Sequence, residues 1–196
     1  RPPQSPPEPV AARRPVHVRF GGVAVPVEPG AFLQASAEGE AALIDAVLAA
    51  AGGARKIADL FAGLGTFSLP LARAAAVHAV EGDPSAIATL SSAARTLPNV
   101  TTARRDLFED PLSASELSRF DAVVFDPPRA GAREQSTRIA ESAVPVVVAV
   151  SCNPATFARD ARILTDSGYH LERVTPVAQF VWSAHIELVA RFTKKP

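Results

Sequence analysis

The sequence has 196 residues, 47% of them hydrophobic, and its 20 basic and 20 acidic side chains give a net charge of zero. This composition predicts one globular domain, without the overall basic charge typical of nucleic-acid-binding domains and without a membrane span. A lone cysteine excludes an internal disulfide and a cysteine-held iron–sulfur cluster, and it favours a cytoplasmic protein. The chain contains no methionine, so we expect a piece of a longer protein.

The first part of the chain divides into a linker and an N-terminal extension. Residues 1–15 are rich in proline and are predicted to be a disordered linker. Residues 16–55 form the extension. Within it, "VHVRFGGVAVPV" has a strand-like run of alternating residues on each side of Gly21-Gly22. This pattern predicts a β-hairpin with the two glycines as its turn. "SAEGEAALIDAVLAAAGG" has apolar residues at helical spacing and predicts a helix over residues 36–53.

Residues 56–196 alternate between strand and helix patterns. The predicted strands are "KIADLFA", "AVHAVEGD", "NVTTARRD", "FDAVVFD", "PVVVAVS", "YHLERVTPVAQF" and "HIELVARFTK", and the helices between them cover residues 66–75, 84–96, 132–143 and 154–166. This order predicts an α/β domain with a doubly wound, mostly parallel sheet of seven strands. The last two strands have no helix between them, so the final strand should be antiparallel.

Glycines and acidic residues follow successive strands. Gly63 and Gly65 lie between a strand and a helix, and the next strand ends in Glu81, where a carboxylate can accept hydrogen bonds from ribose hydroxyls. The third glycine of the dinucleotide fingerprint is missing, which argues against NAD. Asp106 and Asp126 end the third and fourth strands. Acidic residues at successive strand ends line one edge of the predicted sheet, and such an edge suits a cationic adenosine cofactor such as S-adenosylmethionine. Glu81 taken alone could equally be a solvent-exposed residue at the end of a strand.

Cys152 occupies a position where ligands bind in open α/β sheets. It follows the β-branched run "VPVVVAV" and precedes Asn153 and Pro154, which suit the start of a helix. A lone cysteine is more often a small core residue. Here the helix N-terminus should favour the thiolate, so we expect a reactive cysteine.

Five spaced motifs carry a resemblance to a known family. "GAFLQASAEGE", "DLFAGLGTF", "FDPPRAGA", "VSCNPATFARD" and "FVWSAHIE" resemble, in the same order, the RNA 5-methyluridine methyltransferases. These enzymes methylate C5 of uridine in ribosomal and transfer RNA, and "SCNPATFARD" looks closest to the ribosomal RNA branch. The resemblance covers residues 16–195 and implies a class I methyltransferase fold, S-adenosylmethionine as cofactor, RNA as partner and no metal. We expect a monomer.

The resemblance also implies roles for individual residues. Cys152 matches the nucleophile that adds to C6 of uracil, and Glu187 matches the base that removes the C5 proton. The positions that match cofactor contacts are Gln34, Phe61, Gly63, Gly65, Thr66, Glu81, Asp106 and Asp126. Asp126, Arg129 and Trp182 are candidates for substrate contacts. Arg129 could instead form a structural salt bridge, and Trp182 could fill core space.

Two other functions fit part of this pattern. Amino-group methyltransferases acting on DNA or rRNA use a DPPY-like loop, but Arg129 replaces its aromatic residue and those enzymes need no cysteine. A non-catalytic domain that binds cofactor or RNA would not need Cys152 and Glu187. The RNA-binding barrel and central insertion of full-length family members are not recognisable in this sequence, so we expect this piece alone to bind RNA weakly.

Overall fold

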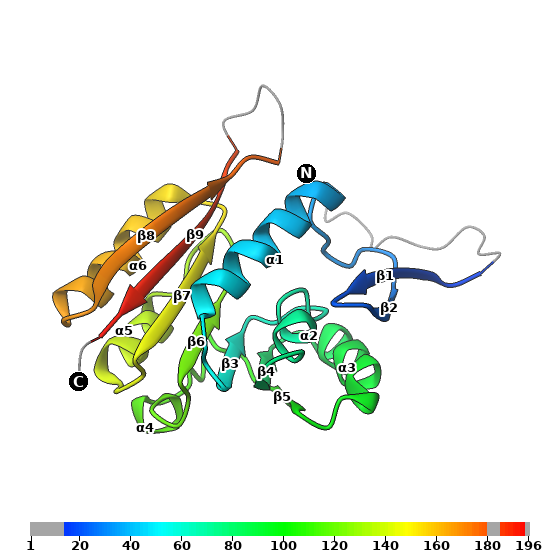
Figure 1. Cartoon of the computed structure of the whole chain (residues 1–196), viewed down its shortest axis with the longest axis horizontal. Helices are drawn as coiled ribbons and strands as arrows, with labels where there is room; N and C mark the ends of the chain where they lie inside the picture. Colours follow the sequence, from blue (N-terminus) through cyan, green and yellow to red (C-terminus); the bar gives the residue numbers. More distant parts are fainter. Residues whose placement is uncertain (1–13, 180–184, 195–196) are drawn as a thin grey trace.

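The computed structural model describes residues 14–179 and 185–194 and is built on one seven-stranded sheet (Figure 1). In sheet order the strands are β5 (Val100–Arg104), β4 (Ala76–Glu81), β3 (Lys56–Leu60), β6 (Ala122–Phe125), β7 (Val146–Ser151), β9 (Glu187–Thr193) and β8 (His170–Val177). The first five run parallel, and β9 is antiparallel to both of its neighbours. The predicted sheet, including its reversed last strand, is confirmed.

Helices cover both faces of the sheet (Figure 1). On one side lie α1 (Ala37–Ala51), α2 (Ser68–Leu71), α3 (Pro84–Ala93) and the 3-10 helix η1 (Ala94–Thr96); on the other lie α4 (Ala114–Leu117), α5 (Arg133–Glu141) and α6 (Pro154–Asp166). Because side chains alternate along a strand, Val124 of β6 packs with Leu43 of α1, whereas its neighbour Val123 packs with Ile139 of α5. The apolar strands are therefore buried on both sides, as a parallel sheet requires.

Two helices differ from the sequence-based expectation. The helix expected over residues 66–75 is regular only in α2, because Arg73 and Ala74 donate to carbonyls three residues back, which tightens the final turn. Helix α4 was not predicted. It is a single turn held by a capping box, in which the Ser113 side chain accepts from the Glu116 N–H and Glu116 accepts from the Ser113 N–H.

The N-terminal hairpin is present and rests on α2. Strands β1 (Val16–Phe20) and β2 (Val23–Val27) pair antiparallel around the glycine turn, and Phe20 is fully buried in a cluster shared with α2 and α3. Gly21 has φ +56°, and a Cβ there would lie 2.9 Å from the Pro70 backbone. Only glycine therefore allows the turn to approach α2 this closely.

The linker predicted for residues 1–15 lies outside the described residues, apart from residues 14 and 15. Along the described ranges, no helix combines the length and apolar character needed to cross a membrane.

The two turn glycines offer a matched test of the hairpin contact. Gly22 also has a positive φ, +89°, but a Cβ there meets no atom within 4 Å in the described part of the chain. Alanine at either position costs about 1–2 kcal/mol for the left-handed backbone. Gly21→Ala adds overpacking against Pro70, so it should lower the free energy of unfolding by a further ~1–3 kcal/mol relative to Gly22→Ala. Urea denaturation of both variants measures the difference, and equal losses would mean that the hairpin does not rest on α2.

Candidate active site

A cleft of about 850 Å³ lies along one edge of the sheet. The carboxyl ends of the parallel strands meet at this edge, and the reversed direction of β9 brings its first residue, Glu187, to the same place. The cleft is lined by nearly all the residues singled out in the sequence: Gln34, Phe61, Gly63, Thr66, Glu81, Asp106, Asp126, Arg129, Cys152 and Glu187. Of the remaining two candidates, Gly65 does not line the cleft, and Trp182 lies outside the described residues.

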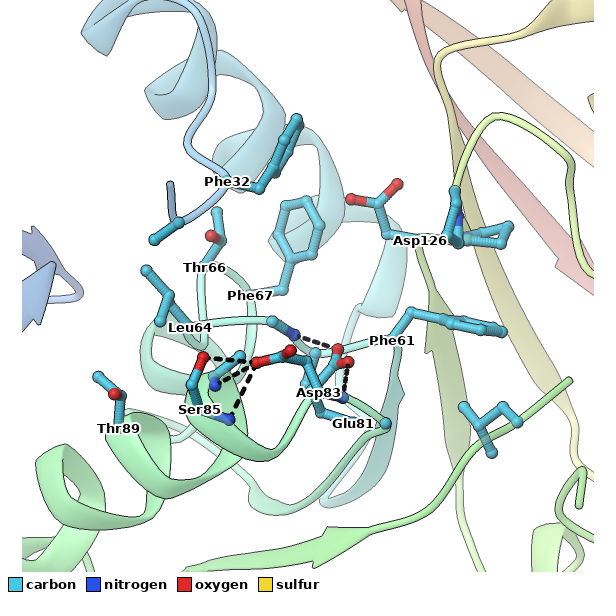
Figure 2. Close-up of a pocket in the computed structure, with 18 of the residues that line it drawn as sticks. Phe32, Phe61, Leu64, Thr66, Phe67, Glu81, Asp83, Ser85, Thr89 and Asp126 are labelled. Atoms are coloured by element: carbon cyan, nitrogen blue, oxygen red, sulfur yellow. Dashed lines mark hydrogen bonds between the residues drawn. The ribbon is translucent and has the colours of Figure 1, made fainter. Parts of the chain in front are cut away.

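The Glu81 carboxylate holds two segments of the cleft wall together. Its Oε2 accepts from the Gly63 N–H at 2.8 Å and its Oε1 accepts from the Asp83 N–H at 2.8 Å (Figure 2). Gly63 has φ +53°, a conformation that glycine adopts without strain. Each carboxylate oxygen can accept more than one hydrogen bond, so Glu81 retains acceptor capacity toward the cleft. The carboxylate is therefore fixed in place and still able to bind a ligand.

Gly65 allows close packing of α3 and does not itself contact the cleft. It has φ +95°, and a Cβ there would overlap Leu90 and lie 3.2 Å from Leu69 Cγ. The glycine thus lets α3 pack closely against the turn that carries Gly63.

Aromatic rings and an acid form the wall after β3 and β5. Phe61 has φ +62°, an uncommon conformation for a bulky residue, and its ring lies 5.4 Å from that of Phe108. Asp106 is exposed at the end of β5 and accepts from the Phe108 N–H at 2.9 Å. The cleft therefore has an apolar surface here, with a carboxylate next to it.

Carboxylates gather at the floor of the cleft. Burial, together with the charges of Glu187 and Asp59, raises the pKa of Asp126 to about 7. Asp59, buried in β3, also has its pKa raised to about 7 by burial, against the hydrogen bond from Ser68 Oγ. The second oxygen of Asp59, Oδ1, is buried and has no hydrogen-bond partner among the residues that the structure describes. This region favours a proton or a cation.

Cys152 and Glu187 lie together beside these carboxylates. Cys152 directly follows β7, and Ser151 at the end of β7 pairs with Leu188 of β9. Burial raises the pKa of the Cys152 thiol, and the charges of Glu187 and Asp126 raise it further. The helix N-terminus was expected to favour the thiolate, but in the protein by itself burial and these two charges have the larger effect on the pKa. Burial also raises the pKa of Glu187.

The loop that follows β6 is tied to the helix that follows Cys152. The Arg129 carbonyl accepts from Asn153 Nδ2 at 3.0 Å and from Thr156 Oγ1 at 3.2 Å. The Asn153 side chain also caps α6 by accepting from the Ala155 N–H, as predicted. The Arg129 side chain is left exposed at the cleft, and its charge lowers the pKa of Cys152 against the larger opposing effects.

Sequence reasoning missed several lining residues. Asp83 caps α3, and hydrogen bonds from Ser85 and from the Ala86 N–H lower its pKa (Figure 2). The pattern "GDPS" was a readable signal for this cap. Phe32 lines the cleft with 79% of its surface exposed, which no sequence pattern indicates. Within the described residues, no group of three or more His, Cys, Asp or Glu side chains is placed to hold a metal ion.

The fold and cleft define an α/β protein of the methyltransferase type, and comparison with known proteins gives the family. The structure resembles the N-methyltransferase NodS of Bradyrhizobium japonicum with a TM-score of 0.66 at 19% identity, a likeness of fold alone. Residues 24–195 match the family described as tRNA (Uracil-5-)-methyltransferase. The chain belongs to this family, which confirms the resemblance that its five motifs carry.

Individual relatives extend the comparison. An RNA methyltransferase of Brucella suis biovar 1 is 56% identical across 90% of this chain and 43% of its own length. The 23S rRNA (uracil(1939)-C(5))-methyltransferase of Chromohalobacter salexigens is 37% identical across 85% of this chain and 35% of its own. The Pyrococcus abyssi tRNA (uracil-54, C5)-methyltransferase, solved with S-adenosyl-L-homocysteine, superimposes with a TM-score of 0.81 at 28% identity over 93% of this chain and 45% of that chain. The chain thus spans less than half the length of these proteins.

The raised pKa of Asp126 predicts a pH-dependent effect on stability. A carboxyl whose pKa is near 7 when folded and near 4 when unfolded costs stability as pH rises through that interval. Asp126→Asn removes the cost, so it should raise the melting temperature by several degrees at pH 8 relative to its effect at pH 5. Asp45→Asn, on the exposed side of α1, makes the same chemical change outside the cleft. The same effect of Asp126→Asn at both pH values would contradict the prediction.

Proposed function

We propose that this chain transfers a methyl group from S-adenosylmethionine to C5 of a uridine in RNA, through a covalent bond between Cys152 and C6 of the uracil. One observation carries the proposal: a single cleft joins a fixed acceptor for ribose, Glu81, to a cysteine and a partly buried glutamate, Cys152 and Glu187. The family supports the same reaction.

The cleft fits the cofactor at two places. The Glu81 carboxylate retains acceptor capacity for the ribose hydroxyls, and the apolar rings of Phe61 and Phe108, which pack against each other at the cleft, suit contact with a base. Asp126, which lines the cleft, favours a positive charge, and the buried Asp59 acts on Asp126 from below; the sulfonium group supplies such a charge. When bound, the cofactor provides an electrophilic methyl group.

Cys152 would begin the reaction on the uracil ring. Its sulfur forms a bond to C6, and the electrons of the C5–C6 double bond move onto the ring as an enolate, which makes C5 nucleophilic. The thiol must first lose its proton, and its pKa is raised in the protein alone. A cation placed near Asp126 and Glu187 offsets the two charges that oppose the thiolate. Cofactor binding therefore favours the nucleophilic form.

Glu187 would complete the reaction. C5 would take the methyl group from the sulfonium sulfur, which leaves S-adenosylhomocysteine. A base must then remove the C5 proton so that the electrons re-form the double bond and expel the Cys152 sulfur. Burial raises the pKa of Glu187, which makes its carboxylate a stronger base than an exposed glutamate. Its place at the start of β9, beside the strand that leads to Cys152, suits this role.

Ribosomal RNA is the proposed substrate, rather than transfer RNA. The relative named for 23S rRNA is 37% identical to this chain, whereas the structure named for tRNA is 28% identical. The exposed Arg129 at the cleft suits a phosphate or a uracil carbonyl. We further propose that the protein acts as a cytoplasmic monomer, with residues 16–55 forming an extension of the methyltransferase domain in residues 56–196.

Loss of the Glu81 carboxylate should weaken cofactor binding. Glu81→Ala removes charge-assisted hydrogen bonds, so we expect roughly 10- to 100-fold weaker binding of S-adenosylhomocysteine by calorimetry. Glu109→Ala removes an exposed acid that does not line the cleft and serves as the control. Wild-type affinity in Glu81→Ala would exclude this residue from the cofactor site.

Substitutions of Cys152 and Glu187 should stop the reaction at different stages. Cys152→Ala should abolish both methyl transfer and the covalent adduct. Glu187→Gln should still allow addition and methylation, and then accumulate a methylated protein–RNA species because the C5 proton is not removed. A denaturing gel with labelled cofactor and 23S rRNA fragments, using the protein that contains this chain, would resolve the adduct as a labelled, shifted band.

Each variant can contradict its assigned role. A shifted band formed by Cys152→Ala would mean that another group attacks the uracil. Rapid turnover by Glu187→Gln would assign proton removal to a different base. An amino-group methyltransferase would form no adduct even in the wild type, and would methylate an exocyclic nitrogen instead of C5.

A further inference from the structure

Gln179 joins the end of the β8 segment to the segment that carries Gln34. Its Oε1 accepts from the Ala35 N–H at 3.1 Å, and its Nε2 donates to Gln34 Oε1 at 2.7 Å. Gln34 lines the cleft, but Gln179 does not. The residue thus contacts a cleft side chain from outside, over a sequence separation of 145 residues.

The backbone contact determines which way both amides face. A backbone N–H can only donate, so the Gln179 oxygen must face Ala35. The Gln179 nitrogen then faces Gln34, which must offer its own oxygen in return. The Gln34 amide nitrogen is left as the end available to the cleft. Without Gln179 the Gln34 amide could turn over and present either end.

The first turn of α1 is shaped around this side chain. Gly39 is buried, and a Cβ there would lie 2.7 Å from Gln179 Cγ. Glycine within a helix is less favourable than alanine, so its use here accommodates a close neighbour. Gln179 therefore occupies a defined position on α1.

The three walls of the cleft match the three substituents of a sulfonium cofactor. The wall at Glu81 suits the adenosyl group, and the wall at Cys152 and Glu187 must receive the methyl group. The remaining wall, formed by residues 28–32 and Gln34 together with Thr66, is left for the amino-acid arm. An amide N–H on that wall would donate to the carboxylate of this arm, whereas an amide oxygen would repel it.

We propose that Gln179 is a positioning residue that turns the N–H groups of Gln34 toward the carboxylate of the cofactor's amino-acid arm. The inference rests on the proposed function and adds a residue outside the cleft that determines how the cleft binds one end of the ligand. Gln179 does not touch the reacting atoms; its contact with Ala35 fixes its own orientation, and it acts on the cleft through the hydrogen bond to Gln34.

A ligand lacking the amino-acid arm separates positioning from a purely structural role. Gln179→Glu keeps an acceptor for the Ala35 N–H but removes the donor to Gln34, so the Gln34 amide should turn and present its oxygen to the cleft. We expect at least 10-fold weaker binding of S-adenosylhomocysteine by calorimetry, with binding of 5′-methylthioadenosine unchanged within twofold. Equal losses for both ligands, or no loss for either, would overturn the proposal.

A double-mutant cycle provides the second readout. In a Gln34→Ala background, Gln179→Glu should cause no additional loss of S-adenosylhomocysteine affinity, because its effect passes through Gln34. The same loss in both backgrounds would assign Gln179 a structural role. Should Gln179→Glu fail to fold by thermal melting, Gly39→Ala displaces the same side chain and should give the same difference between the two ligands. Failure of the wild type to bind either ligand would contradict the proposed function itself.

Discussion

The reversed direction of β9 is the constraint on which the site depends. Five parallel strands deliver their carboxyl ends to one edge of the sheet, and these ends supply the glycine turn, the acids and the cysteine. A sixth parallel strand beside β7 would have presented its last residue there. Because β9 runs the other way, the edge receives its first residue, Glu187, next to the position that follows Ser151. The proposed base and nucleophile thus come together through strand pairing rather than through a flexible loop.

The second feature that organises the site is the repulsion between acidic groups gathered near Cys152. Three carboxyl groups, Asp59, Asp126 and Glu187, have raised pKa values, and the nearby Cys152 thiol does as well. Burying like charges together costs free energy, and functional sites often retain such arrangements. A bound cation removes much of this cost and favours the thiolate at the same time. Binding of a cationic cofactor would therefore favour the ionised form of the proposed nucleophile.

The sequence predicted the structure correctly where interactions between neighbouring residues determine it. Alternation of apolar strands and helices predicted the sheet, and Asn153-Pro154 marked the start of α6 because capping is a local interaction. The ends of the strands correctly indicated which acids would line the cleft. Local reasoning failed for the pKa of Cys152, which depends on burial and on carboxylates from other strands. The contact between Gln179 and Gln34 has no sequence pattern at all, because it joins residues 145 positions apart.

The pKa of about 7 at Asp126 affects how the cleft binds a cationic ligand. At neutral pH Asp126 is divided between its protonated and ionised forms. A cation that binds beside it favours the ionised form, so binding must release part of a proton into the solvent. By linkage, affinity for such a cation increases as the solution becomes more alkaline through neutrality. The heat of binding would accordingly vary with the ionisation enthalpy of the buffer that takes up the proton.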